Sequence, residues 1–187
     1  RCHRVTGVQT CALPILSTVT VLETAKKMID YSHGNLHDIN HFMKVYAYAK
    51  MIADGEQLDP DTQKLVEMTA LVHDIACPLC RVKYGNTNGK NQEKESAALI
   101  AEFFKDSNLP QDFTDRISFL VSHHHTLDQI DGIDYQIIIE ADYLVNADES
   151  HFSGHNIKNM YDKIFKTETG KFLLRSMYQN CLENETL

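Results

Sequence analysis

The sequence contains no run of about 18 consecutive apolar residues, which a membrane-spanning helix requires. It also has too little positive charge to bind a nucleic-acid polymer, since 18 Lys and Arg face 26 Asp and Glu and the formal net charge is −8. Polyanion binding depends on clustered basic residues, and none occur here. We therefore expect a small-molecule ligand, and neither a membrane nor a nucleic acid as partner.

What the chain does contain suits one globular domain. Its 187 residues are 43% hydrophobic and 24% charged, and a chain of this length buries roughly two-thirds of its unfolded surface on folding. No internal repeat divides it. One core and one domain are the expectation.

The first residues differ from the rest. The segment RCHRVTGVQTCALPIL lacks an initiator Met and any helical or strand period, and its apolar run is too short for a signal peptide. It resembles the conceptual translation of a sequencing-library adaptor fused in frame to a gene, although a natural disordered tail is the alternative. We predict that residues 1–16 are non-native or disordered and that residues 17–187 form the domain. Outside this segment three cysteines remain, Cys77, Cys80 and Cys181, an odd number that fits a reducing cytoplasm.

From residue 17 onward the apolar residues recur at helical spacing. VLETAKKMIDYS places its apolar positions on one stripe. The next helix is expected to begin at Asp38 as N-cap and to stop at Gly55, and Asp59-Pro60 to open the helix that ends near His73. Further helices are expected in ESAALIAEFFK, QDFTDRISFLVSHHH, IDYQIIIEADYLVNA, HNIKNMYDKIF and KFLLRSMYQNCLE, and a loop in VKYGNTNGKNQ. IDYQIIIE has strand character but no partner strands, so the predicted fold class is all-α, a single helical bundle.

Two metal-binding patterns meet in TALVHDIACPLC, residues 69–80. The first is the His73-Asp74 doublet and the second is Cys77-x-x-Cys80. A structural zinc site needs a second ligand pair, which Cys181 alone does not supply. A thioredoxin-like motif needs a preceding strand. We therefore interpret the two cysteines as buried or incidental residues.

The doublet has potential partners elsewhere in the chain. Asp142 lies within the apolar run IIIEADYLV, where a carboxylate is costly to bury without a partner or a cation. His73 and Asp74 differ by about 100° around their helix, so one ion over its last turn is within reach of both. With His41 they make a mixed N/O ligand set suited to Mn²⁺, Fe²⁺, Co²⁺, Ni²⁺ or Zn²⁺. Read singly, each residue is equally compatible with a surface histidine or a solvated acid.

The order of these four residues is similar to the H…HD…D signature of the HD-domain superfamily of metal-dependent phosphohydrolases. His41 follows HDIN, the doublet lies in ALVHDIA, and Asp142 lies in EADYL. The resemblance implies one divalent metal, with Mg²⁺ also possible, bound by His41, His73, Asp74 and Asp142. It implies further that His73 and Asp74 lie at the catalytic centre and that a metal-activated water hydrolyses a phosphate ester.

Some HD relatives use histidines near the run Ser122-His123-His124-His125 for a second metal or for the substrate phosphate. Three consecutive helical residues cannot all face one site, so we select His123 and His124 as substrate-binding candidates. In dinuclear relatives a further histidine precedes the next helix, where this chain has Gln92. The departure favours a single metal.

The substrate phosphate also needs positive charge. Lys44 lies one turn after His41, and Lys90 lies in the expected Gly/Asn-rich loop, so both are predicted to bind substrate. Arg81 and Lys83 are further options, and each of the four is also compatible with an ordinary surface cation.

Three functions are compatible with these residues. The favoured one is a cytoplasmic phosphohydrolase acting on a small phosphorylated metabolite such as a nucleotide. The alternative is a non-catalytic helical module that holds metal or ligand for regulation. A third is an HD-type oxygenase, which needs extra histidines for a di-iron centre, and Gln92 argues against it.

Overall fold

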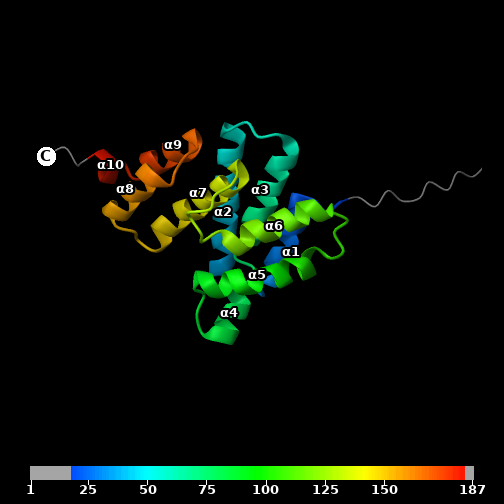
Figure 1. The fold of residues 1–187 in the computed structure, drawn as a ribbon. Coiled ribbons are helices and arrows are strands. Elements are labelled where there is room, and N and C mark those ends of the chain that lie inside the picture. The colour runs from blue at the N-terminus through cyan, green and yellow to red at the C-terminus, as the bar shows by residue number, and fades with distance from the viewer. Residues whose placement is uncertain (1–17, 184–187) are drawn as a thin grey trace, which may run out of the picture.

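The computed structural model describes residues 18–183, and every regular element within this range is an α-helix. The all-α prediction is therefore confirmed. Residues 1–16, predicted to be non-native or disordered, lie outside the described range. In order along the chain (Figure 1) the helices are α1 Val21–Tyr31, α2 Leu36–Gly55, α3 Pro60–Val72, α4 Cys77–Tyr84, α5 Gly89–Phe104, α6 Gln111–His123, α7 Ile133–Glu149, α8 Gly154–Lys163, α9 Glu168–Met177 and α10 Gln179–Glu183.

Helices α2, α3 and α7 form the centre of the molecule, and each packs against the other two. Helix α7 is buried on nearly all sides, from Asp134 through Val145, because α2, α3 and α9 surround it. The expectation of a buried helix rather than a strand at IDYQIIIE is thus confirmed. None of the helices between residues 18 and 183 is long and apolar enough to cross a membrane.

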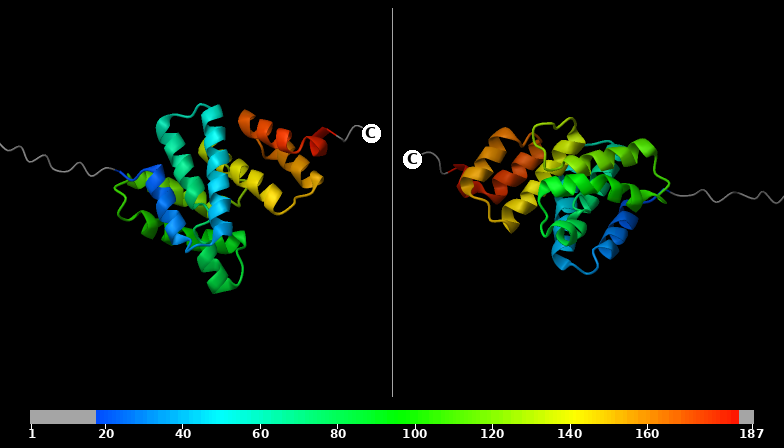
Figure 2. Two further views of the ribbon diagram at one scale, coloured as in Figure 1. Left: turned by 180° about the vertical axis from the view of Figure 1, so that it is seen from behind. Right: turned by 60° about the horizontal axis from the view of Figure 1, so that its bottom comes forward.

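Two hydrophobic clusters lie at either end of this central trio, and Figure 2 shows the elongated shape that results, with α8–α10 at one end and α1, α5 and α6 at the other. The first cluster joins α2 and α7 to the C-terminal helices through residues such as Val45, Ile138, Ile157 and Leu174. The second joins α2 and α3 to the opposite end through Phe42, Leu71, Phe103 and Leu120. The three central helices are therefore fixed from both ends.

Side-chain caps explain where the central helices begin. Asp59 accepts hydrogen bonds from the Asp61 and Thr62 amides, with Pro60 at the first helical position, as predicted. The prediction for α2 was wrong: the N-cap is Asn35, whose side chain accepts from the Asp38 amide. Asp38 therefore lies inside the first turn of α2.

The expected loop at VKYGNTNGKNQ is shorter than predicted. Helix α4 extends to Tyr84 and ends at Gly85, whose φ of 70° lies in the left-handed region that favours glycine. Asn88 caps α5, which begins at Gly89. Lys90 and Gln92 are therefore helical residues. At the C-terminus, the single helix expected in KFLLRSMYQNCLE is divided into α9 and α10 at Tyr178.

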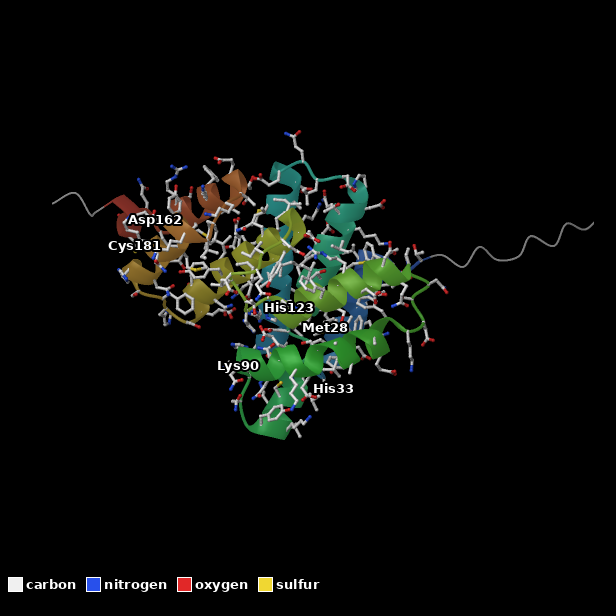
Figure 3. All side chains as sticks on the ribbon, in the orientation of Figure 1. Met28, His33, Lys90, His123, Asp162 and Cys181 are labelled. Carbon is white, nitrogen blue, oxygen red and sulfur yellow. The ribbon has the colours of Figure 1, made fainter. Side chains whose placement is uncertain are left out.

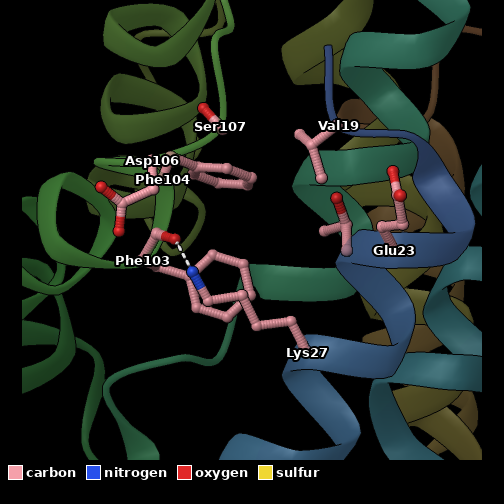
Figure 4. Close-up of a pocket in the computed structure, with 8 residues that line it drawn as sticks. Val19, Glu23, Lys27, Phe103, Phe104, Asp106 and Ser107 are labelled. Atoms are coloured by element: carbon pink, nitrogen blue, oxygen red, sulfur yellow. Dashed lines mark hydrogen bonds between the residues drawn. The ribbon is translucent and has the colours of Figure 1, made fainter. Parts of the chain in front are cut away.

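A cleft of about 220 Å³ separates α1 from the C-terminal end of α5. Figure 4 shows the Lys27 ammonium group spanning it and donating a hydrogen bond to the Phe103 carbonyl oxygen. The cleft shares no lining residue with the histidine and aspartate cluster described next. The Lys27 hydrogen bond connects α1 to the end of α5. This cleft is not part of that site.

Candidate metal centre

The four signature residues converge where the three central helices meet. His41 lies in the second turn of α2, His73 is the C-cap of α3 and Asp74 follows it, and Asp142 lies in the third turn of α7. His41, His73 and Asp142 are buried, while Asp74 is partly exposed. The end of α3 leaves Asp74 at the mouth of the site rather than in the core.

The two imidazole nitrogens lie at similar distances from each other and from one oxygen of each carboxylate. His41 Nε2 is 3.3 Å from Asp142 Oδ1, 3.3 Å from His73 Nε2 and 3.5 Å from Asp74 Oδ2. His73 Nε2 is 3.5 Å from Asp142 Oδ1 and 3.7 Å from Asp74 Oδ2. Ligands at ~2.1 Å from an ion such as Zn²⁺ lie roughly 3.0–3.4 Å apart, so His41 Nε2, His73 Nε2 and Asp142 Oδ1 fit around one divalent cation with little adjustment. Asp74 Oδ2 lies 3.5 and 3.7 Å from the two nitrogens, at the edge of this group.

The hydrogen bonds of the opposite ring nitrogens set the histidine tautomers. His73 Nδ1 donates to the Ala70 carbonyl oxygen at 2.7 Å, and His41 Nδ1 donates to Glu149 Oε2 at 2.8 Å. In the neutral rings the lone pairs therefore lie on Nε2, directed at the shared centre. Two such nitrogens and two carboxylate oxygens are all acceptors, and they repel one another unless a proton or a cation lies between them.

The electrostatics of the site agree with this account. Burial opposes the protonation of His41, but hydrogen bonds and charges from Asp142, Asp74 and Glu149 outweigh it and raise its pKa to about 9. The pKa of Asp142 is lowered well below its usual value, because the hydrogen bonds from His41 and His73 overcome the penalty of burial. The site thus holds negative charge that attracts a cation.

A second group of potential ligands adjoins the first through Asp74. While Asp74 Oδ2 faces His41 and His73, Asp74 Oδ1 lies 3.6 Å from His124 Nε2. His124 Nδ1 donates to the Val121 carbonyl oxygen, and its Nε2 is buried without a hydrogen-bond partner. His125 completes this group. An orphaned, buried nitrogen beside a carboxylate fits a further ligand, either an ion or a polar group of a substrate.

Gln92 occupies the wall next to this second group. Its side chain is buried, its Nε2 donates to the Thr87 carbonyl oxygen at 3.0 Å, and its Oε1 has no hydrogen-bond partner. It lines the same cleft as Asp74 and His125. The Gln92 amide oxygen therefore lies at the position where dinuclear HD relatives have a further histidine.

The histidine run divides differently from the prediction. His123 Nδ1 donates to the Phe119 carbonyl oxygen, and its ring stacks on Phe119 at 4.3 Å, outside both ligand groups; Figure 3 marks its place at the end of α6. Helix α6 ends at His123, so the 100° spacing no longer applies to the next two residues. The turn brings His124 and His125 together at the site.

A cleft of about 260 Å³ leads from solvent to these ligands, and we call it the polar cleft. Its lining includes Arg81, which donates two 2.6 Å hydrogen bonds to Asp38, another lining residue. The remaining lining residues are His37, His41, Asp74, Cys77, Thr87, Gln92, His125, Asp142, Asn146, Glu149 and Ser150. Arg81 is therefore the cation that the fold brings to the ligands.

The two predicted lysines lie elsewhere. Lys44 is half-exposed and donates to Glu149 Oε1 at 2.9 Å, behind His41. Lys90 is exposed at the N-terminal end of α5, as Figure 3 shows, and does not line the polar cleft. Lys83 pairs with Glu95 at 2.8 Å. The roles predicted for Lys44 and Lys90 in substrate binding stay predictions.

Cys77 and Cys80 are both buried and carry free thiols. Burial, followed by the charge of Asp74, raises the pKa of Cys77, which disfavours the reactive thiolate. Among the described residues, neither group of potential ligands includes a cysteine. The geometry thus agrees with the interpretation of these residues as incidental.

Two further residues complete the site from α7, and the sequence reasoning missed both. Asn146 Nδ2 donates to Asp142 Oδ1 at 2.8 Å, and Glu149 binds His41 as described. They lie four and seven residues after Asp142, one and two helical turns along the same face. That spacing was the available signal, because polar residues on the face of a buried carboxylate are candidates to orient it.

Comparison with known proteins agrees with the geometry. The model of the HD domain family matches residues 38–148, more than half of the chain. The fold is similar to a crystal structure of a predicted HD superfamily hydrolase from an uncultured Thermotogales bacterium, with 21% identity, a TM-score of 0.60, and coverage of 87% of this chain and 86% of that one. No curated protein matches the chain significantly. The chain belongs to the HD domain family.

Proposed function

We propose that this protein is a metal-dependent phosphohydrolase that cleaves a phosphate ester of a small metabolite. The observation that carries the proposal is the meeting of His41 Nε2 and His73 Nε2, 3.3 Å apart, with one oxygen each of Asp74 and Asp142 at 3.3–3.7 Å from these two nitrogens. These residues would hold one divalent ion, of Mn, Fe, Co, Ni, Zn or Mg. Such an ion lowers the pKa of bound water and polarises a phosphoryl oxygen.

The protein groups around the ligands divide the remaining work. Glu149 and the Ala70 carbonyl hold the His41 and His73 rings with Nε2 toward the centre. Asn146 orients the Asp142 carboxylate. Arg81 offers a planar, bidentate donor for phosphate oxygens. When the substrate binds, the Arg81 guanidinium releases Asp38 and donates to the phosphate instead.

His124 has a separate role in this proposal. Because its Nδ1 donates to the Val121 carbonyl, the neutral ring presents a lone pair at Nε2, beside Asp74 Oδ1. That nitrogen accepts a hydrogen bond from the substrate or binds a second ion more weakly. The one carboxylate of the second group is Asp74, whose other oxygen faces His41 and His73, so the first site has two carboxylates and the second shares one of them. Charge balance therefore gives the first group the tightly bound ion.

The test is hydrolysis of a panel of phosphate monoesters and diesters by protein reconstituted with each metal. Release of inorganic phosphate from a monoester, or of the alcohol from a diester, that disappears in the Asp74→Asn variant supports the proposal. The alternative, a regulatory module that binds metal or ligand without turnover, is favoured if metal and phosphate esters bind but no ester is cleaved. We further propose a cytoplasmic location, since Cys77, Cys80 and Cys181 carry free thiols.

A further inference from the structure

A second cleft opens on the other side of Asp142, and we call it the apolar cleft. It has a volume of about 260 Å³ and shares His125, Asp142 and Asn146 with the polar cleft. Its other walls are mostly apolar, with Leu127, Ile139, Tyr143, Phe152 and Met160 beside the polar residues His124 and Asn156. A substrate whose phosphate is bound by His41, His73, Asp74 and Asp142 can therefore extend into the polar cleft or into the apolar cleft.

The charges of the two clefts differ. The polar cleft includes Arg81 with Asp38 and Glu149, whereas no Lys or Arg is among the residues that line the apolar cleft. The carboxylate and imidazole side chains of the apolar cleft are those of Asp142, His124 and His125, and all three belong to the two groups of potential metal ligands. A charged group placed there would lose water without gaining an opposite charge. The occupant of the apolar cleft is therefore uncharged.

The walls also indicate the shape of the occupant. The Tyr143 and Phe152 rings have centroids 5.6 Å apart and planes inclined by 38°. Tyr143 is nearly buried and Phe152 is half-buried, so Phe152 is the more accessible of the two rings. Aromatic faces of this kind bind planar rings by offset stacking or edge contact.

Two asparagines supply hydrogen bonds at the rim. Asn146 Nδ2 is used by Asp142, which leaves its Oδ1 as an acceptor. The Tyr143 hydroxyl donates to Asn156 Oδ1 at 2.6 Å, which leaves the Asn156 amide nitrogen as a donor. A donor and an acceptor beside aromatic walls suit a ring with a hydrogen-bonding edge.

We propose that the apolar cleft is the leaving-group subsite and selects phosphate esters of an uncharged alcohol that carries a planar ring. This inference rests on the proposed phosphohydrolase function. A nucleoside and a simple aryl alcohol share the required chemistry. The asparagines favour the nucleoside, because a plain aryl ring has no hydrogen-bonding edge.

The experiment compares a nucleoside 5′-monophosphate, phenyl phosphate and glycerol 3-phosphate as substrates. Phe152→Ala is expected to lower the ratio of kcat/KM for the ring esters over that for glycerol 3-phosphate by about 3- to 10-fold. Asn156→Ala, at an exposed position, is expected to lower the ratio for the nucleotide alone. The matched control is Phe172→Ala, an exposed phenylalanine of α9 outside the cleft, which should leave every ratio unchanged.

A binding measurement on metal-free protein separates this inference from the proposed function. The nucleoside without phosphate is titrated into the wild type and the Phe152→Ala variant by calorimetry, and the variant is expected to bind about 3- to 10-fold more weakly. Nucleoside binding that depends on Phe152, without hydrolysis of any ester, supports the subsite and overturns the phosphohydrolase. Hydrolysis of all three esters with unchanged ratios in Phe152→Ala and Asn156→Ala overturns the subsite and leaves the phosphohydrolase standing.

Discussion

Two pairs of residues able to bind metal lie within eight positions of each other, His73-Asp74 and Cys77-x-x-Cys80, and the fold treats them oppositely. The doublet lies where α2, α3 and α7 meet, so helices distant in sequence bring it further ligands. The cysteines lie on the short helix α4, and within the described residues they belong to no group of three or more potential ligands. A metal site therefore depends on the convergence of helices, not on a local spacing.

The surroundings of the two pairs sharpen the difference. We call His41, His73, Asp74 and Asp142 the tetrad. Each of its two imidazoles donates its Nδ1 proton to an oxygen, which directs Nε2 toward the centre of the site. Burial and the negative charge of Asp74 raise the pKa of Cys77 and keep the thiol protonated. The Asp74 carboxylate thus adds a ligand to the histidine site and disfavours the thiolate that a cysteine site would need. The predictions below test this contrast.

The largest effect is expected from removing a carboxylate of the tetrad. Asp142→Asn keeps the side-chain shape but removes a charged ligand, so we expect metal affinity to fall by at least about 100-fold, above the range typical of outer-shell changes, and activity to fall to background. Elemental analysis and titration of metal into the apo protein measure the loss. A folded variant that keeps its metal would mean that Asp142 is only a satisfied polar group of the core.

Glu149 should have a smaller effect, since it acts on the ion through His41. Glu149→Ala removes the acceptor of His41 Nδ1, and an outer-shell loss of this kind costs about 10- to 100-fold in metal affinity. Glu149→Gln should recover part of it. Glu102→Ala is the control, because Glu102 is exposed and pairs with Lys105 far from the site. Equal affinities in all three variants would remove Glu149 from the site.

Arg81 and Lys90 form the next comparison. Arg81 lines the polar cleft, whereas Lys90 is exposed on α5. Arg81→Ala is expected to weaken substrate binding by about 1.5–3 kcal/mol, the value of a hydrogen bond to a charged group. Lys90→Ala should change it by less than about 0.5 kcal/mol. Both variants should keep normal metal content. The reverse order of effects would show that Lys90 binds the phosphate, as predicted from the sequence.

The cysteines should matter least. Cys77→Ala with Cys80→Ala removes two buried sulfur atoms, so we expect the free energy of unfolding to fall by about 1–3 kcal/mol. Metal content and turnover should stay within a few-fold of the wild type. Loss of stoichiometric metal from this variant, with His73 and Asp74 intact, would show that the cysteines are ligands.

Much of the fold followed from the sequence because its signals are local. The apolar period of VLETAKKMIDYS and the Asp59-Pro60 cap each lie within a few residues, and both predictions were confirmed. Helix α4 was missed because its eight residues are too few to show an apolar stripe and no side chain caps its start. Asn35 was overlooked as the cap of α2 because Asp38, three residues later, is an equally good capping residue by type.

The site was less predictable where it depends on the path of the chain. The choice of His123 over His125 assumed that the helix continues, but α6 ends at His123. His125 then packs on Gly89, where a Cβ would lie 2.7 Å from His125 Cδ2. The contact joins residues 36 positions apart, which no local pattern reveals. Arg81 is similar, because its pairing with Asp38 joins residues 43 positions apart on α4 and α2.

The most direct test of the account is the dependence of turnover on one tightly bound ion. The purified protein is expected to carry close to one divalent metal per chain and to lose metal and phosphatase activity together on chelation. Both should return on addition of Mn²⁺, Co²⁺ or Ni²⁺, with no recovery in Asp74→Asn. Hydrolysis that continues after complete removal of metal, verified by elemental analysis, would contradict the account.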